Sequence, residues 1–408
     1  MLPAKFPAQR NSFPKVVEKS VSGGRMSRLR VCILFLAVTI HCFGQAANGK
    51  LQIHHIDMGQ GDAALLISPG GETVLFDAGE DIAQRKQCNV IVDYLDQAGV
   101  REIDYIFVSH YHSDHIGCIP AVLSRFPLKN TAYDRGKTYT TPTFKKYVAA
   151  VNSHRKAASV GDVIRLDEGT GHEVAITVEA LNGQYPGGKV NARDENDVSL
   201  IALVVFGNFH EEIGGDLSGA KTGNYVDVET GASTSIGPLD VYKVHHHCSS
   251  HSSNATWMST TQPTVAIIST GDGNKYKHPA ADCIQRLSQA NVTRNYWTET
   301  GNGKKPGAKD VIGGDILIEV PANSRTFTVS HNDGIKDTYR IKAEPAATQP
   351  TEDLTSPTEE NLIRYAWSVR SHYYYDLDCS AVKRISKANL QTGANPPLDK
   401  EHFDCSGK

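Results

Sequence analysis

The sequence lacks an excess of either charge. Its 408 residues contain 42 Lys and Arg against 45 Asp and Glu, a formal net charge of −3. A dedicated nucleic-acid-binding protein is therefore disfavoured, because no strong field attracts polyanions, although an enzyme that acts on a nucleic acid transiently is not excluded. There is no long internal repeat, and beyond residue 40 no apolar run is long enough to cross a bilayer. The length allows one large domain or two.

The apolar run at residues 31–40 follows a basic segment that begins at Met26. Gly44 and Ala46 stand at the −3 and −1 spacing of a signal-peptide cleavage site. We therefore expect an N-terminal extension and signal peptide at residues 1–47, and a secreted or periplasmic protein without a stable membrane span after signal removal. A buried helix or a retained anchor is the alternative.

Eight cysteines are present, and two of them, Cys32 and Cys42, fall within the expected signal. In an oxidising compartment some of the other six should pair. We expect Cys379 to pair with Cys405, because both lie in the C-terminal tail. The sequence does not define the pairing of the other four, which are Cys88, Cys118, Cys248 and Cys283.

From residue 51 the pattern predicts a β-rich domain. Apolar runs predict strands at 51–56, 64–68, 72–77, 105–108, 174–181, 200–206, 239–244, 264–269, 315–320 and 325–330. Helical spacing predicts helices at 90–98, 144–152 and 280–290. Residues 218–238 are rich in Gly and Thr and are expected to form a loop. The Ala, Pro, Thr and Glu of residues 343–358 are typical of a linker between a domain at 48–342 and a small Cys-containing module at 359–408.

A cluster of metal-type side chains follows the predicted strand at 105–108. Residues 109–118 read SHYHSDHIGC, which places His110, His112, Asp114 and His115 in the spacing H-x-H-x-D-H. Imidazole and carboxylate are ligands that suit Zn²⁺, Mn²⁺ or Fe²⁺. A polar surface loop is the alternative, but histidine is uncommon, and three within six positions argue against chance.

Two more strand ends carry such side chains. Asp216 follows Gly214 and Gly215, and three histidines at 245–247 follow the strand at 239–244. Strand ends that are distant in sequence lie side by side in a sheet, so these residues can converge on one cavity. Asp216 has two oxygens and can bridge two cations. A turn-capping role for Asp216 and a solvated turn for the histidines are the alternatives.

Two cations held in this way would polarise a substrate oxygen and lower the pKa of a shared water from about 15.7 to about 7. Hydroxide would then be supplied without a protein nucleophile. The serines beside His251 are not framed by a Gly-x-Ser-x-Gly motif and are not expected to act as one.

The H-x-H-x-D-H motif, the later Gly-Asp and the later His pair together resemble the metallo-β-lactamase superfamily. More narrowly, residues 56–62, 216–217, 243–249 and 276–279 resemble the hydrolase domain of ComEC-type competence proteins, whose membrane channel is absent here. The resemblance runs from about residue 51 to residue 329. It implies an α/β (α+β) fold, a four-layer αββα sandwich with a small C-terminal module, and a site for one or two metals. Zn²⁺ is expected there, with Mn²⁺ or Fe²⁺ as alternatives.

The resemblance also implies roles by position. His110 and His112 would bind a first metal, Asp114, His115 and His246 a second, and Asp216 would bridge them. Asp114 and His247 are also predicted to take part in catalysis, His247 by contacting substrate or orienting a ligand. The other residues expected to contact substrate or orient ligands are Asp57, Gln60, Asp62, Asn196, Ser249 and His278. For Asp57, Gln60 and Asp62 the alternative is a turn, and for His278 a structural loop.

The sequence departs from the superfamily pattern at several positions. Residues 194–199 contain no histidine, so a first metal would be bound loosely or through Asn196. Cys118 and Cys248 replace two glycines, and metal binding, a disulfide or simple space-filling are open for them; we favour space-filling. In the tail, a disulfide-stapled module of unknown partner is favoured over a zinc module built from His372, Cys379, His402 and Cys405.

Together these features predict an exported hydrolase that uses a metal-activated hydroxide on a phosphodiester or related ester, in the manner of a nuclease or phosphodiesterase. Its substrate would be a small molecule, a nucleotide or a nucleic acid. Lactam or lactone hydrolysis by the same fold is one alternative, and a non-catalytic metal-binding module is the other.

Overall fold

The computed structural model describes residues 47–81, 87–331 and 334–342 and, with short gaps, residues 365–405. The predicted signal peptide and the predicted linker at 343–358 lie outside the described residues. The limits of the predicted domains stay predictions. Among the described residues, no helix combines the length and apolar character needed to cross a bilayer.

Two mixed sheets form the body of residues 47–342. The first has the order β19 (Lys336–Arg340), β18 (Thr326–His331), β17 (Ile316–Pro321), β1 (Lys50–His55), β2 (Ala64–Ile67), β3 (Thr73–Phe76), β4 (Ile103–Phe107), β5 (Leu128–Asp134) and β6 (Arg155–Ala157). The second has the order β16 (Asp310–Ile312), β15 (Arg294–Trp297), β14 (Val265–Ile268), β13 (Val241–Lys243), β12 (Phe209–Gly214), β11 (Ile201–Phe206), β8 (Val174–Ala180) and β7 (Val163–Leu166).

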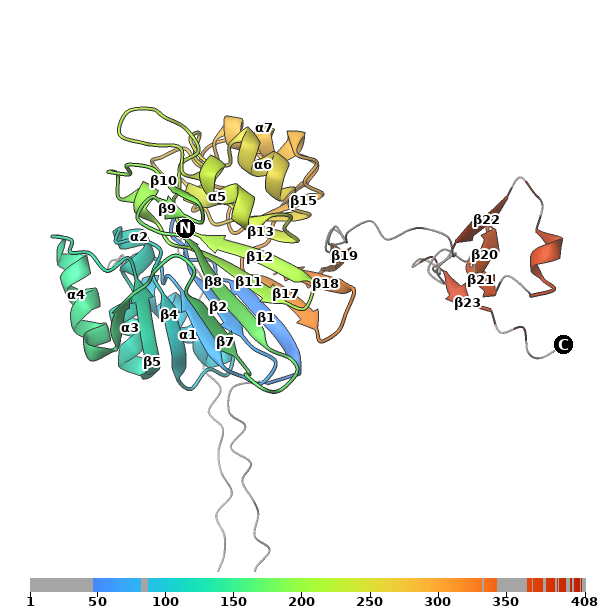
Figure 1. The fold of residues 1–408 in the computed structure, drawn as a ribbon, viewed down its shortest axis with the longest axis horizontal. Helices are drawn as coiled ribbons and strands as arrows, with labels where there is room; N and C mark the ends of the chain where they lie inside the picture. Colours follow the sequence, from blue (N-terminus) through green and yellow to red (C-terminus); the bar gives the residue numbers. More distant parts are fainter. Residues whose placement is uncertain are drawn as a thin grey trace, which may run out of the picture. The chain divides into compact units, whose positions relative to one another are not determined.

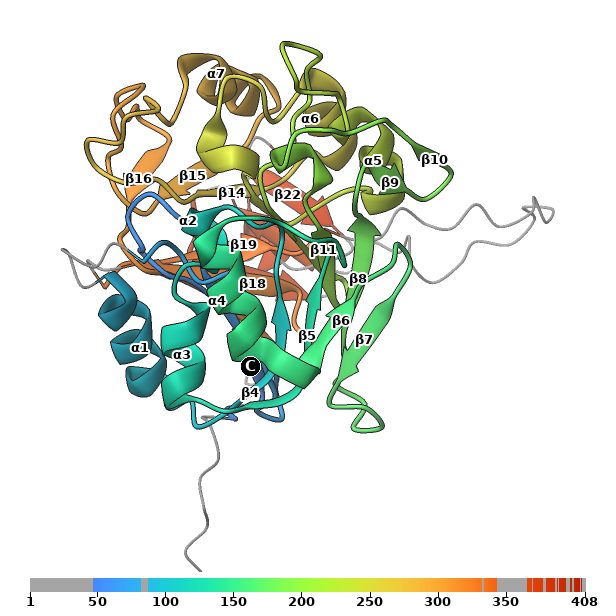
Figure 2. The same cartoon turned by 90° about the vertical axis from the view of Figure 1, so that its left-hand side faces the viewer.

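Helices cover the outer faces of both sheets. The described helices are α1 (Gln87–Gln97), α2 (Ser113–Ile116), α3 (Ile119–Arg125), α4 (Pro142–Val151), α5 (Glu229–Ile236), α6 (Ala255–Thr261) and α7 (Ala281–Gln289). Short elements complete the domain: β9 (Gln184–Tyr185), β10 (Gly188–Lys189) and the 3-10 turns η2 (Asn152–His154), η3 (Asn196–Val198) and η4 (His245–Cys248). Figures 1 and 2 show α1, α3 and α4 on one side of the paired sheets and α5, α6 and α7 on the other.

Alternation along the strands explains this layering, because successive side chains point to opposite faces of a sheet. In β2, Leu66 packs between the two sheets, whereas Leu65 packs under α1 and α3. In β14, Ile267 packs between the sheets and Ile268 packs under the helices of the second layer. One hydrophobic core therefore lies between the sheets, and one lies under the helices on each outer face. The predicted αββα sandwich is confirmed.

The predicted strands and helices all overlap observed ones, but the predicted loop at 218–238 is wrong. It contains α5, which buries Ala232, Ser233 and Ile236. Its residues are small and polar, so the sequence shows little helical periodicity. The helix is held instead by packing beside α6 and by the Glu229 carboxylate, which accepts hydrogen bonds from the backbone N–H groups of Ser253 and Asn254 at 2.6 Å.

Parallel pairing brings the polar strand ends to one edge of each sheet. In the first sheet β3 runs parallel to β4, and in the second β12, β13 and β14 run parallel to one another. Neighbouring parallel strands end at the same edge, where ligands bind in α/β folds. Asp77 and His110 follow two such ends in the first sheet, and Asp216 and the histidines of η4 follow two in the second.

The C-terminal module is a four-stranded sheet in the order β22 (Leu390–Gly393), β20 (Tyr365–Ser368), β21 (Tyr373–Asp376) and β23 (Glu401–His402), with a 3-10 turn η6 (Val382–Arg384). The predicted disulfide between Cys379 and Cys405 is confirmed. Because these two thiols are joined to each other, the alternative zinc module has lost its sulfur ligands.

Candidate metal centre

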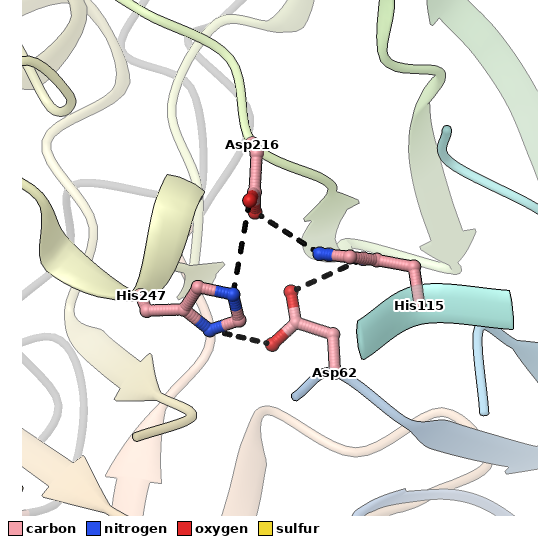
Figure 3. Close-up of side chains that lie close together, drawn as sticks. All are labelled: Asp62, His115, Asp216 and His247. Atoms are coloured by element: carbon pink, nitrogen blue, oxygen red, sulfur yellow. Dashed lines mark ion pairs between the residues drawn. The ribbon is translucent and has the colours of Figure 1, made fainter. Parts of the chain in front are cut away.

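Four buried side chains meet where the strand ends converge. Asp62, His115, Asp216 and His247 each offer a ligand atom, and these atoms lie within 4.8 Å of one another. Figure 3 shows the Asp216 carboxylate between the two imidazoles, with Asp62 on the opposite side. Oδ1 of Asp216 lies 3.4 Å from Nε2 of His115, and Oδ2 lies 3.7 Å from Nε2 of His247.

The His115 ring is oriented by a carboxylate behind it. Nδ1 of His115 donates to Oδ2 of Asp77 at 2.8 Å, and Asp77 in turn accepts from the backbone N–H and the hydroxyl of Ser109. This bond keeps a proton on Nδ1, so Nε2 is the nitrogen that could bind a metal, as is usual for metal-ligating histidines. Nε2 is buried and has no hydrogen-bond partner among the described residues.

The His247 ring is oriented in the same way by a backbone carbonyl. Nδ1 donates to the carbonyl oxygen of Ser269 at 3.1 Å, and Nε2 lies 3.5 Å from Oδ2 of Asp114 without a hydrogen-bond partner. The backbone of η4 is unusual, since His246, His247 and Cys248 have φ of 50°, 52° and 60°. Left-handed conformations cost energy for residues other than glycine, and they gather at functional sites where the surrounding structure enforces them.

A second group of side chains also approaches Asp216. Nε2 of His246 is 3.8 Å from Oδ2 of Asp216 and 3.5 Å from the amide nitrogen of Asn196. Nε2 of His110 is 3.9 Å from the same oxygen and 3.0 Å from Nδ1 of His112. Asp216 thus contacts both groups, which is the position that a bridging ligand requires.

The two neighbouring histidines take different places from those expected. The resemblance groups His246 with Asp114 and His115, whereas in the structure His247 lies beside Asp114 and His246 lies beside Asn196. The left-handed turn of η4 sends successive side chains in directions that sequence spacing does not show. The ligand assignment itself stays a prediction.

Asp62 lies within the four-residue cluster, but its charge is already balanced. Nζ of Lys243 lies 2.7 Å from Oδ2 of Asp62, and both side chains are buried. Burial would raise the pKa of Asp62, but Lys243, followed by His247 and His115, holds that pKa below its usual value. Oδ1 of Asp62 has no hydrogen-bond partner among the described residues and lies 3.4 Å from Nδ1 of His247, so Asp62 is a fourth residue that could hold a cation.

The electrostatics of the cluster favour a cation. Burial would lower the pKa of His115, but the carboxylates of Asp216, Asp77 and Asp114 raise it well above its usual value. Burial would likewise raise the pKa of Asp216, which the surrounding histidines hold well below its usual value. Within the cluster, the atoms without a hydrogen-bond partner among the described residues are Nε2 of His115, Nε2 of His247, Oδ1 of Asp216 and Oδ1 of Asp62. Two imidazole nitrogens and a carboxylate oxygen are a donor set that fits Zn²⁺, Mn²⁺ or Fe²⁺.

A cavity of about 660 Å³ opens over this cluster. Its described lining residues are Gln60, Tyr111, His112, Ser113, Asp114, Tyr139, Thr141, Pro142, Thr143, Asn196, Asp216, Tyr225, His246, His247, Ser249, Ser250, His251, Tyr276 and His278. The volume is that of an ordinary small-molecule site. Burial, followed by the nearby His247 and His246, lowers the pKa of His278 to about 3, so its ring faces the cavity uncharged.

The residues expected to contact substrate divide into two sets. Gln60, Asn196, Ser249 and His278 line the cavity. Asp57 does not: its backbone N–H donates to Asp315 at 2.8 Å, and its carboxylate accepts from the backbone N–H of Gly59 at 3.0 Å. These contacts are those of a turn residue, which was the alternative for this position.

The space-filling role favoured for Cys118 and Cys248 is wrong. Cys118 is bonded to Cys88 and Cys248 to Cys283. Each disulfide therefore ties a histidine-bearing segment to a helix, since Cys88 lies in α1 and Cys283 in α7. The sequence shows neither pairing, because the partners are 30 and 35 residues apart and meet only through the fold.

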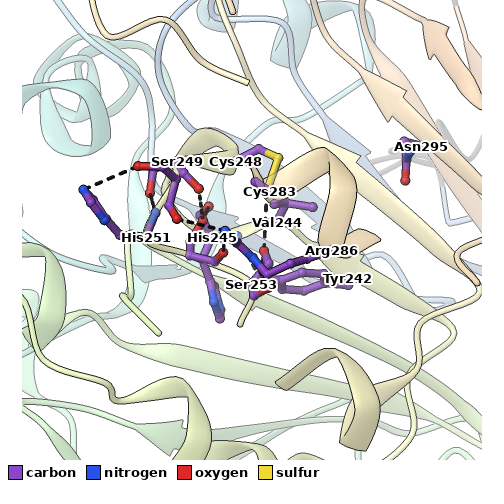
Figure 4. The surroundings of a disulfide bond; sticks show 12 residues. Tyr242, Val244, His245, Cys248, Ser249, His251, Ser253, Cys283, Arg286 and Asn295 are labelled. Atoms are coloured by element: carbon purple, nitrogen blue, oxygen red, sulfur yellow. Dashed lines mark hydrogen bonds between the residues drawn. A yellow bond between two sulfur atoms is a disulfide. The ribbon is translucent and has the colours of Figure 1, made fainter. Parts of the chain in front are cut away.

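Helix α7 holds the segment after His247 by more than the disulfide. Arg286 donates to the backbone oxygens of Ser253, Ser252 and Ser250 at 2.8, 2.7 and 3.0 Å. Figure 4 shows Arg286 and Cys283 on the same helix, beside Cys248 and Ser253. The histidine turn is thus fixed covalently and by hydrogen bonds.

Sequence reasoning missed several residues of the site. Asp77 follows β3, and His110 follows the neighbouring strand β4. Because parallel neighbouring strands end at the same edge of a sheet, this arrangement could have indicated that Asp77 lies at the site. Lys243 immediately precedes the triple histidine, but nothing in the sequence pairs it with Asp62. Tyr139 and Tyr225 reach the cavity from separate loops and show no motif. Tyr276 also lines the cavity, and it lies in the segment 276–279 that resembles the ComEC-type domain, although no role was predicted for it.

Comparison with known proteins assigns a large part of this chain to a superfamily. Residues 57–257 match the metallo-beta-lactamase superfamily. The chain therefore contains a domain of the metallo-β-lactamase superfamily, with the fold of that family's hydrolases.

Within this class the chain is similar to competence proteins of the ComEC type. It is 24% identical over 276 residues to ComE operon protein 3 of Bacillus subtilis (strain 168), covering 64% of this chain and 33% of that protein. It is 27% identical over 256 residues to Recombination protein 2 of Haemophilus influenzae, covering 62% of this chain and 29% of that protein. The chain spans about a third of the length of these relatives. Among solved structures, the metallo-beta-lactamase fold protein YhfI from Bacillus subtilis aligns with a TM-score of 0.38 at 14% identity. The alignment covers 63% of this chain and 99% of that chain.

Proposed function

We propose that this protein is a metal-dependent hydrolase that cleaves a phosphodiester or a related phosphate ester. The observation that carries the proposal is the set of buried ligand atoms of His115, His247 and Asp216 that have no hydrogen-bond partner in the described part of the chain and lie beneath an open cavity. Divalent cations bound there would polarise a phosphoryl oxygen and supply hydroxide at neutral pH. A non-catalytic scaffold has no need to keep such a set of atoms buried without partners.

The chain's own residues would bind and orient the substrate. Nε2 of Gln60 is buried without a hydrogen-bond partner among the described residues, and the side chain lines the cavity. It can donate to a substrate oxygen, as can the amide of Asn196, which also lines the cavity. His278 is uncharged, and its Nδ1 also has no partner in the described part of the chain, so the ring can hydrogen-bond a leaving oxygen.

The choice of a phosphodiester is supported by the relatives. The curated proteins similar to this chain are named as competence and recombination proteins, and a shorter match of 93 residues, at 32% identity, is to a protein named Endoribonuclease YSH1 of Kluyveromyces lactis. These names point to nucleic acids. Such a substrate is compatible with the near-zero net charge if it is held at the cavity rather than along a basic surface.

The test compares two chromogenic substrates on the same metal-loaded protein. We expect turnover of bis-p-nitrophenyl phosphate and none of nitrocefin, with activity lost on chelation and restored by Zn²⁺ or Mn²⁺. Turnover of nitrocefin alone would favour the lactam alternative. Turnover of neither, by protein shown to contain metal, would refute both substrate assignments.

We also propose that the protein works in an oxidising compartment outside the cytoplasm. Three disulfides join the six cysteines that the structure describes, a pattern that is rare in cytosolic proteins. Fractionation of a producing cell, followed by N-terminal sequencing of the mature protein, tests this proposal. We expect exported protein that begins near residue 47, and full-length protein in the cytosol would contradict it.

A further inference from the structure

An exposed tyrosine stands at the rim of the cavity, at the end of a row of parallel rings. Tyr276 lies in the segment between β14 and α7 and is 54% exposed, although most large side chains of this domain are buried. Its ring lies 5.7 Å from that of His278, with an angle of 22° between their planes. The His278 ring lies 6.0 Å from that of His247, at 24°. The row therefore leads from the candidate metal centre to solvent.

The segment that carries Tyr276 is held by paired polar groups. The buried side chain of Asn274 donates to the backbone oxygens of Gly271 and His278 at 2.9 and 2.8 Å, and it accepts from the backbone N–H of His278 at 3.0 Å. Asn302 donates to the backbone oxygen of Asn274 at 2.9 Å. A ligand that stacks on Tyr276 thus meets a pre-organised loop and incurs little ordering entropy there.

Two lysines flank this tyrosine. Lys275 and Lys277 are exposed, and neither forms an ion pair within the described residues. Nζ of Lys275 lies 5.0 Å from the centre of the Tyr276 ring. Stacking of a base on an aromatic side chain is stronger than an exposed cation–π contact. A base would therefore displace the ammonium group, which is then free to pair with a phosphate.

We infer that Tyr276 is the stacking platform for an unpaired base of a nucleic-acid strand whose phosphodiester lies over the metal centre, and that Lys275 and Lys277 bind the neighbouring phosphates. A base within a duplex is stacked on both faces and cannot present a free one to this ring, so the substrate is single-stranded at this point. The inference rests on the proposed phosphodiester function and adds to it the kind of strand that the site accepts.

The experiment measures binding of two labelled oligonucleotides of equal length to the full chain. One is an oligothymidylate, and the other has the same backbone with abasic sites. We expect Tyr276→Ala to weaken oligothymidylate binding by about 5- to 150-fold, the range that corresponds to the loss of one stacked base. Binding of the abasic strand should be unchanged, and Tyr276→Phe should bind both strands like the parent protein.

The role of the two lysines is tested by the salt dependence of oligonucleotide binding. Lys275→Gln with Lys277→Gln should weaken both oligonucleotides equally and reduce the salt slope of binding by about 1–2. Ile312→Ala is the matched control for Tyr276→Ala, because Ile312 is an exposed apolar side chain on β16 that does not line the cavity. Thermal unfolding of each variant confirms that it is folded.

The results separate this inference from the proposed function. An equal loss on both strands in Tyr276→Ala, no loss on either, or no binding of oligothymidylate by the parent protein would overturn the inference even if bis-p-nitrophenyl phosphate is hydrolysed. A base-dependent loss in a protein that hydrolyses no phosphodiester would support the platform and refute the hydrolase.

Discussion

Nδ1 of His115 donates a 2.8 Å hydrogen bond to the carboxylate of Asp77, and both side chains are buried. The bond joins the segment after β3 to the helix α2 that carries His115. It turns Nε2 of His115 toward Asp216, so the carboxylate behind the ring sets the geometry in front of it.

Removing the charge of Asp77 should therefore weaken metal binding. We expect Asp77→Asn to lower the affinity for Zn²⁺ by about 10- to 100-fold, because residues that orient a metal-ligating histidine have effects of that size. Competition with a chromophoric chelator measures the affinity. Asp167→Asn is the control: Asp167 is a buried aspartate that accepts hydrogen bonds from Ser68 and Gly70 outside the cavity, and its loss should leave the affinity unchanged.

The disulfide beside His247 should stabilise both the domain and the metal centre. We expect the double variant Cys248→Ala, Cys283→Ala to lose about 2–4 kcal/mol of unfolding free energy, the usual contribution of a disulfide that closes a loop of this length. It should also release metal faster to a chelator, since the left-handed histidine turn loses its covalent tie. Denaturant titration and stopped-flow chelation are the measurements.

The disulfide of the C-terminal module provides the control. Cys379→Ala with Cys405→Ala removes a disulfide that closes a similar loop in the C-terminal module. Metal release should not change in that variant. Equal release rates for the two double variants would show that the bond between Cys248 and Cys283 does not support the histidine turn.

The stability of the domain should fall as the pH rises from about 4 to about 6 through the ionisation of Asp57. Burial, the largest cause, and the nearby Glu299, Asp315 and Asp272 raise the pKa of Asp57 to about 6, against a reference value of 3.8. The folded state thus holds this proton more tightly than the unfolded state, so stability decreases across this interval and the loss is complete above it.

Asp57→Asn should remove that part of the pH dependence. Asn keeps the oxygen that accepts from Gly59 but cannot ionise, so the variant should be more stable than the parent at pH 7 by roughly 1–2 kcal/mol, with the effect reduced because the side chain is partly exposed. Denaturant titrations at several pH values compare the two proteins. Parallel profiles between pH 4 and 6 would contradict the role of Asp57.

The layers of the fold were predictable because alternation places Leu65 and Leu66 on opposite faces of one strand. Helix α5 was not, since its small polar residues pack well without a periodic apolar pattern. The strand end at Asp216 and the histidine motif were visible as a ligand set. The positions of the His246 and His247 side chains were not visible, because they follow from three successive left-handed residues that only the tertiary structure imposes.

The partners of the ligands were also beyond the sequence. The contact of Lys243 with Asp62 joins residues 181 positions apart. The disulfides at Cys118 and Cys248 likewise depend on where α1 and α7 pack. The kind of ligand can be predicted from the side chains that follow the strands. The orientation of each ligand depends on contacts made across the fold.

The most direct test is elemental analysis of the parent protein and of His247→Ala, with bis-p-nitrophenyl phosphate turnover measured on the same samples. We predict that the parent contains one or two divalent cations per chain. His247→Ala should stay folded, lose at least one of them and show no measurable turnover. Unchanged metal content in His247→Ala, or phosphodiester hydrolysis by protein free of metal, would contradict the proposal that the atoms gathered around Asp216 form the catalytic metal centre.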